Sequence, residues 1–242
     1  MDYNYNNNNY QQNSYQQYEQ TNGLAEYSKR VFSWMFLGLG ITFIVGFVLL
    51  MNSERVIWFL VENIGLYYIA ALVEVVIVFI LGFFVKKLSP TACKVIFLLY
   101  SLVNGFTIAP ALIVYGVQSA FYAFAATALI FGGISVYGMV TKRDLTKLGP
   151  ILFIGLIGLL IYSIFAMIFR MPMSDLITSI VGIVLFIGFT AYDTQKIKKY
   201  YSFYSGDEAT IQKTAIIAAL DLYLDFINLF LYILRLFARN NR

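Results

Sequence analysis

The feature that most constrains this chain is an apolar stretch near its end, residues 214–237, that carries carboxylates inside it. The stretch is long enough to cross the roughly 30 Å of hydrocarbon in a bilayer. A carboxylate in hydrocarbon costs several kcal/mol unless it is paired, protonated or turned toward a wet cavity. Four polar residues recur here at spacings of four, three and four, which places them on one helical face: Asp221, Asp225, Asn228 and Tyr232. We therefore predict that this helix lies inside a bundle, with its polar face turned toward other helices.

The rest of the chain has the composition of a membrane protein. Of its 242 residues, 60% are hydrophobic and 12% are charged, which is far from the balance of a soluble domain. Seven separate apolar runs approach the roughly 20 residues that a membrane-spanning helix needs. We predict an all-α membrane protein with seven transmembrane helices, at about 31–51, 64–85, 93–115, 119–140, 150–169, 174–193 and 214–237.

Rare residue types exclude several kinds of site. Cys93 is the only cysteine in the sequence, so we expect no internal disulfide and no cluster of thiolate ligands. The sequence has no histidine, which argues against haem ligation and histidine-based zinc sites. We assign no metal site and expect no cofactor. The formal charge of +4 is what basic cytoplasmic loops produce, so it indicates no nucleic-acid partner.

The first residues differ from everything that follows them. Residues 1–24 are almost wholly Asn, Gln and Tyr, and they lack the basic start and apolar core of a signal peptide. Such a segment cannot bury enough apolar area to offset its ordering entropy. We predict a disordered, inert polar tail over residues 1–24, with self-association as the alternative, and a seven-helix transmembrane domain over residues 25–242.

Basic residues alternate between the loops and indicate the orientation. Most loop Lys and Arg residues precede span one or lie between spans two and three, four and five, and six and seven, whereas the other loops hold Arg55 and Arg170. By the positive-inside rule, the N-terminus is cytoplasmic. Seven spans then place the C-terminus outside, despite the arginines near it, and the alternative is that the last helix does not fully cross the membrane. The compartment is the plasma membrane of a bacterium or the endoplasmic reticulum of a eukaryote.

Asp193 ends span six beside several lysines, at the inner rim of the membrane. If the chain turns near Ala209, Asp193 and Asp225 reach the same depth on antiparallel neighbours. Two carboxylates in contact cannot both ionise cheaply, so they would share one proton. The alternative is that Asp193 is an ordinary rim residue paired with Lys196 or Lys87.

A second buried acid, Glu74, lies near the middle of span two. It is either a pore-lining ligand for a cation, since calcium prefers carboxylate oxygens, or a neutral acid hydrogen-bonded to a neighbouring helix. Two lysines, Lys86 and Lys87, follow the same span. They either anchor the loop or serve as counter-ions for Asp193.

Two stretches of the second half stand out as a pair, residues 191–197 (AYDTQKI) and 222–230 (LYLDFINLF), and residues 105–110 and 141–149 precede them. These four motifs, in this order, resemble those of the Bax inhibitor-1, or transmembrane Bax inhibitor motif, family, and the first two are similar to its paired signature. The resemblance covers about Ser28 to Phe237.

The resemblance implies a fold and a function. The family's fold has seven helices, with the C-terminal helix central and the others wrapped around it. Its members are described as pH-sensitive calcium leak channels in which an aspartate pair senses pH, a role that falls here on Asp193 and Asp225. Asp221 lies outside this pair, where it would attract cations or disturb the shared proton, and Asn228 is a further cation-contacting candidate. The expected partners are the bilayer and calcium as permeant ion, and no protein partner is indicated.

Other classes of function compete with the channel. A proton-coupled cation transporter would use the same acids as a proton relay, and a non-conducting regulator of cell death or stress would act through partner helices. Intramembrane aspartyl proteases also place an aspartate on each of two helices, but their second aspartate follows Gly-x-Gly. Here Asp225 follows the bulky Leu222-Tyr223-Leu224, so we expect no enzyme. A retinal protein is excluded because the last span has no lysine at its middle.

Overall fold

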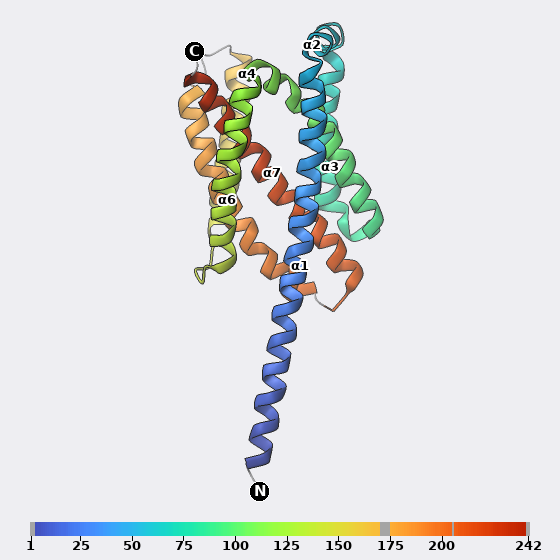
Figure 1. Ribbon diagram of the computed structural model, residues 1–242, viewed down its shortest axis with the longest axis vertical. Coiled ribbons are helices and arrows are strands. Elements are labelled where there is room, and N and C mark those ends of the chain that lie inside the picture. Colours follow the sequence, from blue (N-terminus) through green and yellow to red (C-terminus); the bar gives the residue numbers. More distant parts are fainter. Residues whose placement is uncertain (1–2, 170–174, 205, 241–242) are drawn as a thin grey trace.

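The chain is a bundle of helices. The computed structural model describes the backbone of residues 3–169, 175–204 and 206–240, and the side chains of residues 21–237 except 167, 170–175 and 205. Throughout these residues the regular elements are helical (Figure 1): α1 (Tyr3–Met51), α2 (Ser53–Glu62), α3 (Ile64–Phe84), the short 3-10 helix η1 (Val85–Lys87), α4 (Pro90–Val140), α5 (Leu148–Ile168), α6 (Asp175–Tyr204) and α7 (Glu208–Asn240).

The described helices cross the bundle seven times, as the sequence predicts. Six of them are long and apolar enough to span a bilayer, and the longest, α4, contains two crossings. Its backbone leaves the helical region at Gly116, where φ is 81° and ψ is 160°. A residue with a side chain rarely adopts a positive φ, so glycine permits the chain to turn back here. The two halves of α4, residues 90–115 and 117–140, match predicted spans three and four.

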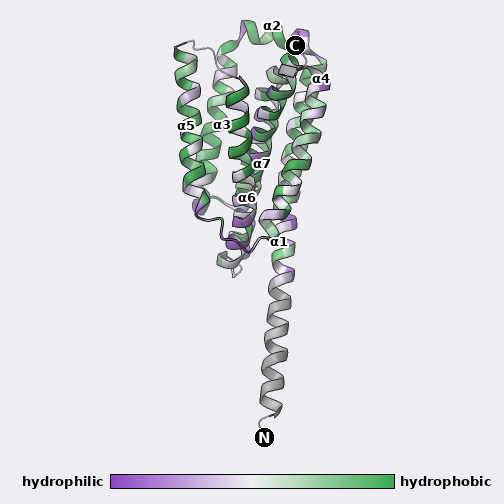
Figure 2. Ribbon diagram, turned by 90° about the vertical axis from the view of Figure 1, so that its left-hand side faces the viewer, coloured by the Kyte–Doolittle hydropathy of each residue, from purple (hydrophilic) through white to green (hydrophobic). Residues whose placement is uncertain are grey.

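Helix α7 is the centre of the bundle. Helices α1, α4 and α6 all pack against it, whereas α3 packs against α4 and α5 packs against α6. Its side chains Leu222, Tyr223, Leu229 and Phe230 are fully buried. The outer faces of α3 and α5 instead expose large apolar side chains, and Figure 2 shows this hydrophobic exterior. Exposed apolar surface of this extent belongs against lipid, so the all-α membrane fold with a central C-terminal helix is confirmed.

Small residues let α1 approach α4 closely. A Cβ atom added to Gly105 would lie 2.8 Å from the backbone oxygen of Thr42 and 2.6 Å from Val45 Cβ. Gly38 faces Phe97 and Ser101, and its own Cβ would overlap both side chains. Transmembrane helices commonly use such positions because lipid supplies no hydrophobic force between them, so contact must come from close packing.

The helix ends correct one detail of the predicted layout and leave another untested. Helix α6 continues to Tyr204, well beyond the expected end at residue 193, so Asp193 lies inside the helix. The backbone of α1 is helical from Tyr3, and the side chains of residues 1–20 lie outside the described part. The disordered tail over residues 1–24 stays a prediction.

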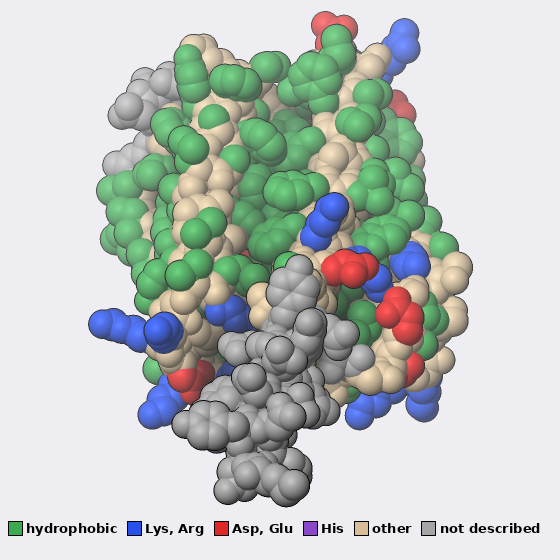
Figure 3. Space-filling view, turned by 60° about the horizontal axis from the view of Figure 1, so that its bottom comes forward, with side chains coloured by type: hydrophobic (Ala, Val, Ile, Leu, Met, Phe, Trp, Pro, Cys, Tyr) green, Lys and Arg blue, Asp and Glu red, His purple; other side chains and the backbone are tan. Residues whose placement is uncertain are grey.

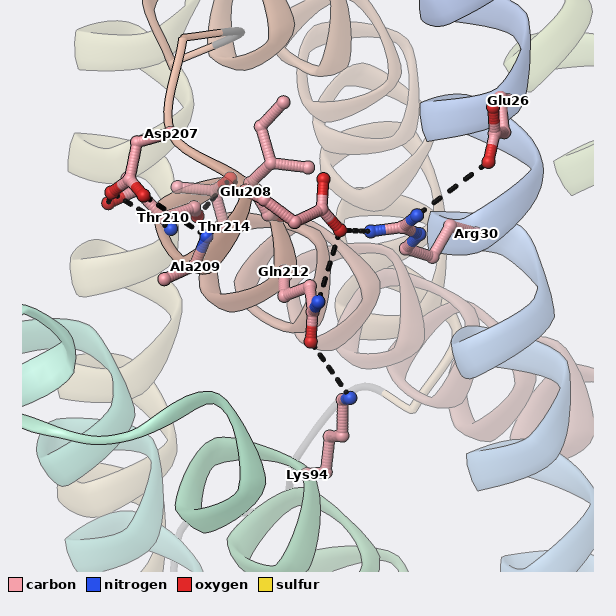
Figure 4. A network of polar contacts seen from close by, with 10 residues as sticks. Glu26, Arg30, Lys94, Asp207, Glu208, Ala209, Thr210, Gln212 and Thr214 are labelled. Atoms are coloured by element: carbon pink, nitrogen blue, oxygen red, sulfur yellow. Dashed lines mark hydrogen bonds and ion pairs between the residues drawn. The ribbon is translucent and has the colours of Figure 1, made fainter.

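Basic side chains gather at the end of the bundle where α1 enters it, which Figure 3 shows from below. The network in Figure 4 ties three helices together there. Arg30 Nη1 of α1 lies 2.9 Å from Glu208 Oε1 of α7, and Arg30 Nη2 lies 3.7 Å from Glu26 Oε1. Gln212 Nε2 donates to the same Glu208 oxygen at 3.0 Å, and Lys94 Nζ of α4 donates to Gln212 Oε1 at 3.1 Å. The network fixes the start of α7 against α1 and α4.

Asp207 caps the start of α7. Its carboxylate accepts the backbone N–H groups of Ala209 and Thr210, both at 3.2 Å, and the hydroxyl of Thr210. The Thr210 hydroxyl, followed by these backbone groups, holds the pKa of Asp207 below its usual value. An acidic cap at this position satisfies free N–H groups, and its negative charge interacts favourably with the positive end of the helix dipole.

Candidate functional site

The acids of α6 and α7 are joined by a lysine that sequence reasoning placed only in an alternative. Lys196 lies one turn beyond Asp193 on α6, and its Nζ is 3.3 Å from Asp193 Oδ1. The same Nζ is 2.8 Å from Asp221 Oδ2 on α7. Lys196 therefore bridges the two helices, with its closer contact to Asp221. Asp193 itself is 9% exposed, so it is a buried residue, and its ion-pair partner is the Lys196 named in the rim-residue alternative.

The turn between α6 and α7 sets the relative depths of the acids. Asp193 lies eleven residues before Tyr204, the end of α6, whereas Asp221 and Asp225 lie thirteen and seventeen residues after Glu208, the start of α7. At about 1.5 Å of rise per residue, Asp221 comes within about 3 Å of the level of Asp193, and Asp225 lies about 9 Å deeper before helix tilt is counted. The predicted equal depth therefore fits Asp221 better than Asp225.

Asp225 is the most deeply buried acid of the group. It is 4% exposed, and its Oδ2 has no hydrogen-bond partner among the described residues. It lines the same cavity as Asp193 and Asp221. A buried carboxylate oxygen without a partner costs free energy, because the lost hydration is not replaced. Such a group calls for a proton or a cation.

One cavity of about 820 Å³ brings the predicted site residues together. It lies among α3, α4, α5, α6 and α7. Its lining includes every acid singled out from the sequence, the asparagine of the same helical face, and the lysine that bridges Asp193 and Asp221: Glu74, Asp193, Asp221, Asp225, Asn228 and Lys196. Asn228 donates from Nδ2 to the Leu224 carbonyl at 2.8 Å, so its side-chain oxygen remains as an acceptor. The polar face predicted for α7 thus lines a cavity from Asp221 to Asn228.

Tyr232, the fourth residue of that face, lies beyond the cavity. Its ring stacks on Phe186 of α6 with 6.0 Å between ring centroids, and it covers Gly182. Phe186 lines the cavity. The aromatic pair therefore packs α6 onto α7 one turn past Asn228.

Glu74 both lines this cavity and is hydrogen-bonded to the neighbouring helix. Its Oε1 accepts from Thr107 Oγ1 at 2.5 Å and from Asn104 Nδ2 at 3.1 Å, both on α4. The two alternatives drawn from the sequence are therefore compatible: the hydrogen bonds hold a carboxyl group at the cavity wall.

The hydrogen bonds continue from Glu74 into the core, which sequence reasoning missed. Tyr223 of α7 donates to Asn104 Oδ1 at 2.8 Å, and its hydroxyl lies 2.6 Å from Thr42 Oγ1 of α1. Thr42 in turn donates to the Ser101 carbonyl at 2.8 Å. The signal was a set of polar residues inside spans one, three and seven, but spacing alone does not pair residues on different helices.

Neither Lys86 nor Lys87 lines the cavity that holds Asp193. Lys86 lines a separate cavity with Asp207 and Lys213, and Lys87 Nζ lies 5.8 Å from the ring centre of Phe84. The loop-anchoring alternative fits this arrangement. The counter-ion of Asp193 is supplied by Lys196, from the same helix.

Gln195 fastens the loop between α4 and α5 to α6. Its Nε2 donates to the Arg143 carbonyl at 2.7 Å, and its Oε1 accepts the backbone N–H of Leu145 at 2.8 Å. Lys199, one turn further on, contacts Asp144 at 3.5 Å. Two motifs that are far apart in the sequence, 141–149 and 191–197, therefore meet near the basic end of the bundle.

The described residues contain no group of three or more His, Cys, Asp or Glu side chains placed to hold a metal ion. A fixed calcium site would need several carboxylate or carbonyl oxygens around one point.

Comparison with known proteins gives a family match over nearly the whole helical domain. Residues 24–242 match the family model described as inhibitor of apoptosis-promoting Bax1. Inner membrane protein YbhL of Escherichia coli strain K12 is 37% identical over 216 residues, which cover 89% of this chain and 92% of that protein. An uncharacterized membrane protein of Streptococcus pyogenes serotype M1 is 34% identical over 220 residues, 90% of this chain and 95% of its own length. An uncharacterized protein of Borreliella burgdorferi is 36% identical over 210 residues.

Proposed function

This chain belongs to the Bax inhibitor-1 family, and on that basis we propose that it is a pH-sensitive leak channel for calcium. The observation that carries the proposal is that Asp193 and Asp225 line one cavity and that Asp225 Oδ2 has no partner among the described residues. An unpaired acid in a membrane marks an ion or proton pathway more often than it stabilises a fold.

In this proposal, Lys196 neutralises the neighbouring acids to different extents. Its short contact with Asp221 neutralises that carboxylate, and its longer contact only partly neutralises Asp193. Asp193 and Asp225 line the same cavity at different depths, so in this proposal one proton is exchanged between them through the cavity and is not held in a direct contact. Loss of this proton leaves two negative charges on neighbouring helices, and their repulsion favours a second arrangement of α6 and α7.

The described residues hold no three-acid metal site, and this suits a protein that lets calcium pass better than one that holds calcium at a fixed site. Conduction requires that a cation bind well enough to enter and weakly enough to leave. Single carboxyl groups spaced along a wall, at Glu74, Asp225 and Asp193, provide weak successive contacts. The protein acts without catalysing a reaction. It lies in the plasma membrane of a bacterium with its N-terminus in the cytoplasm, since its relatives include an inner membrane protein and its basic side chains gather at the end where α1 enters the bundle.

The test is calcium flux from proteoliposomes at several pH values, with and without an imposed proton gradient. A leak channel gives flux that follows the calcium gradient and depends on pH but not on the direction of the proton gradient. Flux driven by the proton gradient would identify a proton-coupled transporter instead. Equal calcium retention in protein-containing and protein-free vesicles at every pH would indicate a non-conducting regulator.

A further inference from the structure

The walls of the acid-lined cavity are apolar and face the lipid. They come from α3 and α5, the two helices at the outside of the bundle. Phe79 of α3 and Phe153 of α5 both line the cavity, yet they are 56% and 58% exposed. A side chain that both lines a cavity and remains this exposed lies at its mouth. In a bilayer this mouth opens to acyl chains.

The inner end of the same cavity carries excess negative charge. Asp193, Asp221 and Asp225 together bring three carboxyl groups, and Lys196 brings one ammonium group. The contacts of Lys196 show that an ammonium fits here: its Nζ lies 2.8 Å and 3.3 Å from carboxylate oxygens on two helices. Tyr200 and Tyr192 add ring contacts at 5.3 Å and 5.9 Å from Nζ, and aromatic faces attract cations.

Asp225 has no part in the ion pairs that Lys196 makes with Asp193 and Asp221. Its Oδ2 is buried without a partner among the described residues, and its side chain lines the cavity one turn deeper than Asp221. A metal ion would need three or more ligands, and the described residues offer no such group. A single ammonium needs only one or two carboxylate oxygens and no fixed coordination number.

We infer that the cavity is a binding site for a single-chain amphiphile with a protonated primary amine, which enters from the bilayer between α3 and α5. The chain lies along Phe79 and Phe153, and the ammonium donates to Asp225. The cavity volume of about 820 Å³ is within the range of sites for small amphiphiles. Charge complementarity selects the amine, because an alcohol of the same length leaves the carboxylate unpaired and a fatty acid adds a like charge. Binding needs the cavity but does not need conduction, so it stands apart from the proposed channel.

The test is equilibrium dialysis of labelled dodecylamine against lipid nanodiscs that contain the full chain, with empty nanodiscs as the correction for partitioning. Dodecanol and dodecanoate are the matched chains with a neutral and an anionic head. We expect one saturable site for dodecylamine, at least about tenfold tighter than any site for dodecanol, which corresponds to about 1.4 kcal/mol. Equal saturable binding of dodecylamine and dodecanol, or partitioning alone, would overturn the inference.

Two variants with opposite expected effects on dodecylamine binding locate the site. Asp225→Asn removes the carboxylate and is expected to weaken dodecylamine binding at least about tenfold. Lys196→Met removes the competing ammonium, frees Asp221, and is expected to tighten binding. Asp144→Asn, which changes an exposed acid outside the cavity, is the matched control and leaves binding unchanged. If Asp225→Asn does not fold, Lys196→Met decides, since weaker or unchanged binding in that variant contradicts the site. Calcium flux from the same preparations is read separately, so a failed channel and a failed binding site give different results.

Discussion

At the scale of single residues, Lys196 determines how three neighbouring aspartates differ. It contacts Asp221 and Asp193 but belongs to the helix of Asp193 alone. Two buried carboxylates and a partly exposed third share one ammonium, which leaves a charge imbalance that protonation or a cation must correct. In the proposed function, protons or cations correct this imbalance.

Glu74 provides a prediction at this scale. Its Oε1 accepts two hydrogen bonds from α4, and a glutamine oxygen can accept the same pair. Glu74→Gln is therefore expected to keep expression and thermal stability while it lowers calcium flux several-fold, because the charge at the cavity wall is lost. Glu62→Gln changes an exposed acid at the end of α2 and serves as the control. Unchanged flux in a well-folded Glu74→Gln protein would remove Glu74 from the conduction pathway.

Asp144, which lies outside the membrane-spanning helices, provides a second prediction at this scale. Hydrogen bonds from the Thr146 hydroxyl and N–H, with Lys199 nearby, hold the pKa of Asp144 below its usual value of 3.8. Because the folded pKa is the lower one, this carboxylate stabilises the loop above about pH 3.8, and the contribution is lost as the pH falls through the folded value. Thr146→Val should return the pKa toward 3.8, and Thr146→Ser should keep it low. Carbon-detected NMR titration of labelled aspartate measures this, and equal pKa values in both variants would refute it.

At the scale of helices, close packing explains which elements surround α7. Gly138 of α4 faces α6, where an added Cβ would lie 2.7 Å from the Ala191 carbonyl oxygen and 3.0 Å from Thr194 Cβ. These atoms belong to the motif that carries Asp193. The position of that acid therefore depends on a glycine in another span.

We expect Gly138→Ala to destabilise the fold by about 1–3 kcal/mol, because backbone atoms of α6 must move to admit the methyl group. Gly132 lies in the same half of α4 with open space around it, so Gly132→Ala is the matched control. It should be neutral or slightly stabilising, since alanine is the better helix former. The free energy of unfolding from SDS titration in mixed micelles distinguishes the two. Equal free energies of unfolding for the two variants would show that the contact between α4 and α6 can admit a methyl group at Gly138.

The sequence predicted the helices better than their contacts. Seven apolar runs gave the spans, and Gly116 fell between the predicted third and fourth. The site acids could be found because charge is conspicuous in an apolar run. The pairing of Lys196 with Asp221 and of Tyr223 with Asn104 could not, because it depends on how far α6 extends and how α4 and α7 are rotated. Periodicity within one helix carries no information about either.

At the scale of the whole molecule, an odd number of crossings separates the termini, and Figure 1 shows them at opposite ends. Lys142 lies in the exposed loop before α5, whereas Arg55 lies on α2 at the other end. Native Cys93 is fully buried, so it gives little background in cysteine labelling.

These positions test the orientation. A membrane-impermeant maleimide should label Arg55→Cys in intact cells and label Lys142→Cys only after permeabilisation. This follows from the positive-inside rule applied to the basic end of the bundle. The reverse pattern would place the N-terminus outside.

The central claim is that Asp193 and Asp225 share a proton that controls cation flow. The most direct measurement is dye-detected calcium flux from proteoliposomes at several pH values for Asp193→Asn, Asp225→Asn and Asp221→Asn beside the parent protein. Neutralising either member of the pair should flatten the pH dependence, because no shared proton remains to be lost. Asp221→Asn should shift the midpoint and keep the response, because Lys196 then pairs with Asp193 alone. If Asp193→Asn and Asp225→Asn both keep the parent's pH profile, these acids are not the sensor.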